Sequence, residues 1–175
     1  MPPAAVTPAP PPPPTPALDT AWRIHTAVAE WTGRVDTKAS VVLTLEMAVL
    51  AGLVTLSTGG RGLPGDIRPG LFWCGALLFV AAAACAVMVV MPRMRARHVP
   101  GEAATNFVYF GHLRLWDPAA LAGALTSGVL EVLVRDIVAC SAIAWRKHRL
   151  LQLSIVIASA GGLLLLLALV LAAGG

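Results

Sequence analysis

Residues 31–40 read WTGRVDTKAS, and the apolar stretch 39–58 that begins inside them contains one charged residue, Glu46. An apolar stretch of about 20 residues is the length that a helix needs to cross a hydrocarbon core of ~30 Å. Asp36 and Lys38 come directly before it and are therefore expected at the level of the lipid headgroups. The sequence predicts here a polar helix that leads into a membrane span.

The composition of the whole chain is that of a membrane protein. Of its 175 residues 57% are hydrophobic and 13% are charged, and two further apolar segments contain no Lys or Arg. The expected spans are residues 37–58, 70–91 and 150–173. A helix is the single-segment structure that satisfies its own backbone in lipid, and the alternation of barrel strands is absent. We expect an all-α membrane protein with three transmembrane helices, a short N-terminal interfacial helix and a small helical cytoplasmic segment.

The segments outside the spans are mostly helical or rich in proline. Most of the 14 prolines lie in residues 1–17, which are expected to be a disordered tail. Residues 18–36 have the spacing of an amphipathic interfacial helix, with Trp22 and Trp31 at headgroup level. Residues 59–69 form the expected external loop.

Two local features qualify this division of the chain. Gly33 allows a bend or a close contact, and Asp36 with Thr37 is also suited to cap a helix that begins there, with Lys38 snorkelling. In the cytoplasmic segment 92–149, Asp117 and Pro118 open a helix whose apolar pattern continues toward the third span.

The distribution of positive charge predicts the orientation. Only Arg61 and Arg68, of 13 Lys and Arg residues, lie between the first two spans. By the positive-inside rule the N-terminus and residues 92–149 are expected to be cytoplasmic, with the loop 59–69 and the C-terminus outside. The clusters at 93–97 and 146–149 also suit contacts with lipid headgroups.

Glu46 lies roughly 10 Å inside the first expected span. A charged and unpaired carboxyl at that depth costs about 2–3 kcal/mol or more, so Glu46 is expected to be neutral or to face the bundle interior. Cys85, Ser154 and Ser159 are candidate neighbours. Glu46 is either a pore-lining or gating carboxyl or a protonated acid that joins helices.

The sequence offers little for catalysis or metal binding. Phosphate loops, nucleophile elbows, paired carboxylates and histidine clusters are absent, so we expect a protein that is not an enzyme, with no metal or cofactor. Cys74, Cys85 and Cys140 are interpreted as packing residues. Tyr109 and Phe110, in an aromatic cluster that ends at Gly111, form either a packed turn or a platform on which a nucleobase stacks.

Four stretches resemble the transmembrane effectors of the bacterial Pycsar antiphage system. They are WTGRVDTKAS at 31–40, MPR at 91–93, YFG at 109–111 and CSAIAWRKHRLL at 140–151. The resemblance implies an effector that a cyclic pyrimidine nucleotide, cyclic CMP or cyclic UMP, from a neighbouring pyrimidine cyclase activates. Such an effector impairs the inner membrane and causes abortive infection.

The resemblance and the shared membrane side of its motifs lead to a hypothesis for the ligand site. The nucleotide phosphate meets Lys38, Arg93 and Lys147, beside Asp36, and the base lies near Tyr109 or Phe110. Membrane damage by a chain of three helices requires a homo-oligomer among the lipids. A nucleic acid polymer is not an expected partner.

Two other classes of function remain open. One is a constitutive pore-former that resembles a phage holin, and the other is a structural or regulatory membrane subunit that docks a cytoplasmic partner.

Overall fold

The protein is built from helices. The computed structural model describes residues 15–58, 69–91, 106–126 and 128–173, and within these ranges there is no strand. Three helices, α1, α2 and α6, are long and apolar enough to cross a membrane, which confirms the predicted all-α class. The proline-rich tail up to residue 14, most of the expected external loop and Arg93 lie outside the described residues. The elements are α1 (Pro16–Thr58), α2 (Pro69–Val90), α4 (Phe110–Leu113), α5 (Pro118–Ala124) and α6 (Val129–Ala173).

Helix α1 is continuous over 43 residues, or about 65 Å. The interfacial helix expected at 18–36 and the span expected at 37–58 are parts of this one helix. Gly33 neither ends the helix nor makes a close contact, because nothing lies within 4 Å of the place where its Cβ would be. Asp36 therefore lies inside a helix, and the alternative that it caps a new helix is wrong. The level at which α1 enters the membrane stays a prediction.

Helix α6 has 45 residues and is continuous into the third apolar segment, as the sequence pattern predicts. The helix expected from Pro118 onward is nevertheless divided, because α5 ends at Ala124 and α6 begins at Val129. Gly128, with φ of 76°, lies in the left-handed region that glycine tolerates and other residues avoid. The predicted cap is confirmed, since the Asp117 carboxylate accepts hydrogen bonds from the backbone N–H groups that follow it.

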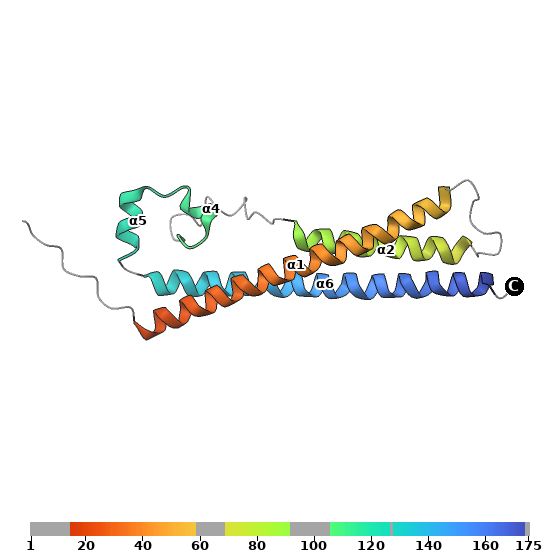
Figure 1. Ribbon diagram of the computed structural model, residues 1–175. Helices are drawn as coiled ribbons and strands as arrows, with labels where there is room; N and C mark the ends of the chain where they lie inside the picture. The colour runs from red at the N-terminus through yellow and green to blue at the C-terminus, as the bar shows by residue number, and fades with distance from the viewer. Residues whose placement is uncertain (1–14, 59–68, 92–105, 127, 174–175) are drawn as a thin grey trace, which may run out of the picture.

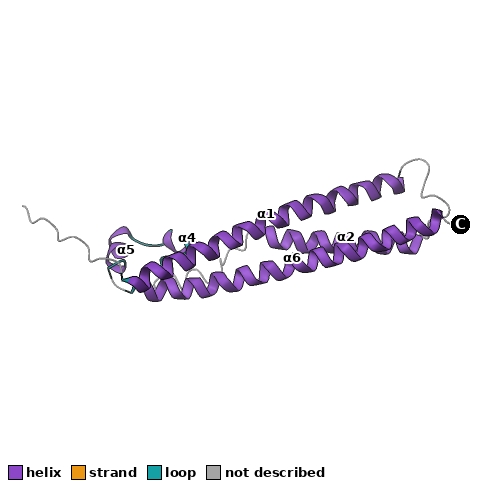
Figure 2. Ribbon diagram, turned by 60° about the horizontal axis from the view of Figure 1, so that its bottom comes forward, coloured by secondary structure: helices purple, strands orange, loops and turns teal. Residues whose placement is uncertain are grey.

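The three long helices form two regions (Figures 1 and 2). α1 and α6 run in the same direction, and α2 returns between them along part of their length. We call residues 16–38 of α1 and 129–149 of α6 the stem. Helix α2 does not extend along most of the stem. Residues 39–58 of α1, α2, and residues 150–173 of α6 form the apolar bundle.

Helix α2 is the central helix of the apolar bundle. Of its apolar span 39% is buried within the chain, against 11% for each of the other two helices. A Cβ on Gly161 of α6 would lie 3.0 Å from the Gly75 carbonyl oxygen of α2, so the two backbones touch there. Small residues at such a crossing permit the close packing that holds helices together in lipid.

Candidate functional site

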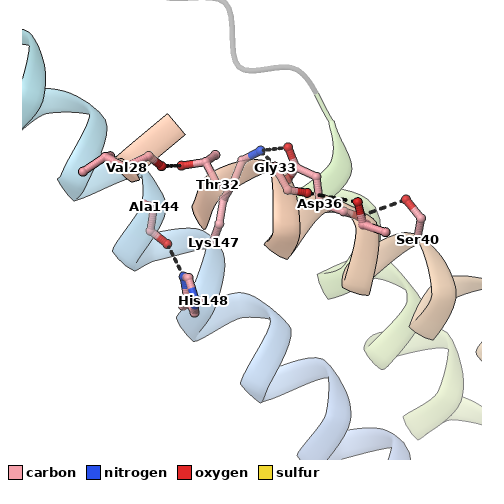
Figure 3. Close-up of polar contacts among 9 residues, drawn as sticks. Val28, Thr32, Gly33, Asp36, Ser40, Ala144, Lys147 and His148 are labelled. Carbon is pink, nitrogen blue, oxygen red and sulfur yellow. Dashed lines mark hydrogen bonds and ion pairs between the residues drawn. The ribbon is translucent and has the colours of Figure 1, made fainter. Parts of the chain in front are cut away.

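The Asp36–Lys147 ion pair joins α1 to α6 at the junction of stem and apolar bundle (Figure 3). The Lys147 Nζ donates to both carboxylate oxygens, at 2.5 and 2.8 Å. The lysine side chain is 14% exposed and the aspartate side chain 38%, so the pair is partly shielded from water. Such shielding makes the attraction stronger than that of a surface pair.

The pair lies beside an apolar cluster in which the three long helices meet. The cluster consists of Val35 and Ala39 of α1, Val89 of α2 and Leu151 of α6. A change in the Asp36–Lys147 contact therefore acts next to the place where α2 joins the other two helices. The sequence brings both charged residues to this seam because helical residues three and four apart share a face, as Asp36 does with Ala39, and Lys147 with Leu151.

The other predicted ligand residues are not gathered around this pair within the described structure. Lys38 is exposed. It follows Asp36 by two residues, a rotation of about 200° around the helix axis, so it lies on nearly the opposite side of α1. Tyr109 is half-buried and packs edge-on against His112, with ring centroids 5.3 Å apart. Arg93 and the side chain of Phe110 are outside the described residues.

The segment that carries Tyr109 is a packed turn. Phe107 is buried and lies edge-on to Trp116 at 6.0 Å. The Trp116 indole N–H donates to the Asn106 carbonyl at 3.0 Å. These contacts support the packing interpretation of the aromatic cluster, while a role in stacking on a base stays a prediction.

Two grooves flank α6 near the ion pair. One, of about 480 Å³, is bordered by Trp31 on α1 and by Trp145, His148 and Arg149 on α6. The other, of about 320 Å³, contains Arg146 and Lys147 and reaches Met88 of α2. Sequence reasoning missed the first groove, because Trp31 was interpreted as a headgroup anchor and Trp145 was noted as part of the stretch 140–151. Trp31 and Trp145 each lie in a stretch that resembles the family, and this shared property could have pointed to the groove.

Glu46 is buried in the apolar bundle and touches one of its predicted neighbours. The Ser154 hydroxyl oxygen lies 2.7 Å from Glu46 Oε1 and 3.0 Å from the Ala82 carbonyl oxygen. The Ser154 hydroxyl is the donor to these two acceptors, and it therefore connects α6 to both α1 and α2. Ser159, the other predicted serine, instead donates to the Ile155 carbonyl of its own helix.

A third polar contact, which sequence reasoning also missed, ties the stem further from the bundle. The His25 Nε2 of α1 lies 3.2 Å from Asp136 Oδ2 of α6, and Asp136 is buried. Cys140 Sγ, interpreted from the sequence as a packing group, lies 3.5 Å from the same oxygen. His25 and Asp136 are 111 residues apart, as are Asp36 and Lys147. The two contacts are 11 residues apart on each helix, which is about three helical turns. They therefore lie on the same face of each helix and follow one alignment of α1 against α6.

Comparison with known proteins agrees with this architecture. A family model described as the Pycsar effector protein domain matches residues 20–174, which include all of α2 and α6 and all of α1 except its first four residues. No curated protein and no solved structure matches the chain. With nearly the whole chain covered by the match, this protein belongs to the Pycsar effector family.

Proposed function

We propose that this Pycsar effector is activated by cyclic CMP or cyclic UMP from an adjacent pyrimidine cyclase, impairs the inner membrane and causes abortive infection. The observation that carries the proposal is the continuity of α1 and α6 from the stem into the apolar bundle. A ligand that binds one arrangement of the stem better than another shifts the bundle by the same free energy. Family membership supports the nucleotide signal and the cyclase partner.

The proposed nucleotide site lies where the stem joins the bundle. The cyclic phosphate competes with the Asp36 carboxylate for Lys147, with Arg93 and Lys38 as further basic residues and Tyr109 or Phe110 near the base. When the phosphodiester binds Lys147, the Asp36–Lys147 ion pair between α1 and α6 is replaced by a contact from Lys147 to the ligand. The loss of that ion pair weakens the junction. Glu46, within hydrogen-bonding distance of Ser154 deeper in the same seam, is the proposed gating residue.

The proposed orientation places the stem in the cytoplasm, where a cyclase product is present. Because three helices do not enclose a wide pore, we infer that the active form is a homo-oligomer in contact with lipids. Non-enzymatic action, in which the nucleotide is a signal and not a substrate, follows from this scheme.

Binding of cyclic CMP and cyclic UMP to the purified full chain in detergent tests the site, with cyclic AMP as the comparison. Lys147→Met is expected to weaken binding at least about tenfold, the value of one charge-assisted contact. Arg146→Met, the matched control at the neighbouring basic position, is expected to change it less. Asp36→Asn is expected to tighten binding, because it releases Lys147 for the phosphate.

The opposite signs of the Asp36 and Lys147 effects separate ligand binding from a purely structural ion pair. If both substitutions weaken binding equally, the nucleotide does not compete with Asp36. If Trp145→Leu and Arg149→Met weaken binding while Lys147→Met does not, the ligand lies in the 480 Å³ groove on the other face of α6, whose volume also suits a small molecule.

Membrane potential in cells tests the activity itself. We expect depolarisation when the protein is expressed with a pyrimidine cyclase and none when it is expressed alone. Depolarisation in both conditions would indicate the constitutive, holin-like pore-former. Its absence in both would favour the subunit that docks a partner.

A further inference from the structure

Three metal-binding side chains meet in the stem, away from the proposed nucleotide site. His25 comes from α1, and Asp136 and Cys140 come from neighbouring turns of α6. One donor atom from each residue lies within 4.8 Å of the other two. The group is about 16 Å from the Asp36–Lys147 pair along α1, since eleven residues separate His25 from Asp36.

The spacing of the donor atoms fits a tetrahedral ion. Zn²⁺ bonds to nitrogen and oxygen at about 2.0–2.2 Å and to sulfur at about 2.3 Å, which puts neighbouring tetrahedral ligands roughly 3.3–3.6 Å apart. The His25 Nε2 to Asp136 Oδ2 distance is 3.2 Å, and the Cys140 Sγ to Asp136 Oδ2 distance is 3.5 Å. Two of the three ligand edges thus already have nearly the required length.

The surroundings hold these ligands in place. Asp136 is 5% exposed and His25 is half-buried, so the site is mostly screened from water. Trp22 packs edge-on against the His25 ring with centroids 5.6 Å apart, which restricts the orientation of the imidazole. Asp136 and Cys140, four residues apart, share one helix face and need no rearrangement of the backbone.

The donor set selects the metal. A thiolate, an imidazole and one carboxylate suit a borderline-soft ion such as Zn²⁺, whereas Mg²⁺ and Ca²⁺ prefer oxygen ligands. We propose that His25, Asp136 and Cys140 bind one Zn²⁺ that clamps α1 to α6 in the stem. Binding releases the Cys140 thiol proton to solvent and requires the neutral His25 tautomer with its hydrogen on Nδ1. Water or a fourth ligand completes the tetrahedron.

The site goes beyond the proposed activation by nucleotide and does not depend on it. The clamp holds the two stem helices at a point distant from Asp36–Lys147, so it sets how far they can separate when that pair opens. Without the metal, His25 and Cys140 both contact Asp136 through its Oδ2 atom.

Zinc binding by the untagged full chain in detergent tests the proposal. After removal of metal with a chelator, Zn²⁺ is titrated in competition with a chromophoric indicator, and bound metal is counted by mass spectrometry. We expect one Zn²⁺ per chain, with affinity at least tenfold lower in Cys140→Ser and in His25→Gln. Cys74→Ser and His148→Gln, which alter exposed residues outside the site, are the matched controls and are expected to bind zinc as the unaltered chain does.

Two further measurements keep a folding defect from imitating the expected result. Co²⁺ is expected to produce a thiolate charge-transfer band that Cys140→Ser removes and Cys74→Ser retains. Zn²⁺ is expected to raise the unfolding temperature of the unaltered chain and not that of Cys140→Ser, whose helical circular dichroism is checked without metal. Less than stoichiometric zinc in the unaltered chain, or equal affinity in Cys140→Ser, would overturn the site.

Discussion

The stem and the apolar bundle are held together by different interactions. In the stem, polar contacts at separate positions, His25–Asp136 and Asp36–Lys147, join two helices. In the bundle, α2 packs closely against α6 where Gly75 and Gly161 touch, and Phe72 and Ala168 form a second buried cluster. The strength of polar contacts changes with salt and with charged ligands, whereas close packing is sensitive to changes in side-chain volume. The difference is consistent with the proposal that the nucleotide acts at the junction of the stem, and it makes close packing the main source of cohesion in the bundle.

The largest expected effect comes from filling the glycine contact. Gly161→Leu forces its Cβ to within 3.0 Å of the Gly75 carbonyl oxygen, and overpacking of this kind costs about 3 kcal/mol. Unfolding in mixed detergent micelles measures the loss. Gly162→Leu is the control, because nothing lies within 4 Å of that position. Equal losses for both would show that the bundle is not held by this contact.

The next effect is expected from the junction of the two regions. Lys147→Met leaves Asp36 without its partner, and the partial exposure of the aspartate reduces the cost to about 1–2 kcal/mol. The same unfolding measurement reports the change, and a double-mutant cycle with Asp36→Asn isolates the pair. Additive single effects in that cycle would contradict a direct interaction.

A smaller effect is expected where a polar contact lies inside the bundle. Ser154→Ala removes the hydroxyl between Glu46 and the Ala82 carbonyl, at a cost of about 1 kcal/mol as for other hydrogen bonds between membrane helices. Ser159→Ala is the matched control, since that hydroxyl bonds within its own helix. A loss from Ser159→Ala as large as that from Ser154→Ala would argue against a special role for this contact.

The smallest effect is expected on the exposed surface of the stem. Arg34→Met breaks an ion pair with Glu30 whose side chains are 69% and 59% exposed, and pairs of this kind contribute about 0.3–0.5 kcal/mol. Thermal unfolding at low and high salt measures the loss of stability. The difference in unfolding temperature between Arg34→Met and the unaltered chain is expected to vanish at high salt. A cost similar to that of Lys147→Met would mean that shielding of Asp36–Lys147 is unimportant.

Prediction from the sequence succeeded for features that depend on neighbouring residues. The apolar segments and the Asp117 cap both follow from local composition and spacing. It failed between Ala124 and Val129, where the apolar pattern continues although one helix ends and another begins, and for the alternative that Asp36 caps a new helix. At both places the apolar pattern is compatible with a helix that continues and with a helix that ends, so periodicity alone does not give the helix boundary.

Sequence reasoning named several residues of the candidate site but not the contacts between them, and their role in binding a nucleotide stays a prediction. Asp36 was placed at headgroup level, Lys147 was named as a basic residue for the nucleotide phosphate, and Ser154 was named as a neighbour of Glu46. Their direct pairing and the meeting of His25 with Asp136 were beyond the sequence, because helical periodicity specifies a face and not the residue opposite it. Trp145 was likewise not recognised as the wall of a groove.

The sequence by itself determined that this chain is helical and has three segments able to cross a membrane, because length and hydropathy are properties of each segment alone. The tertiary structure decided the register of α1 on α6, and with it which polar groups, more than 100 residues apart in the chain, become partners. That register depends on how side chains of three helices fit together, in particular in the cluster of Val35, Ala39, Val89 and Leu151. A single segment contains no information about that fit.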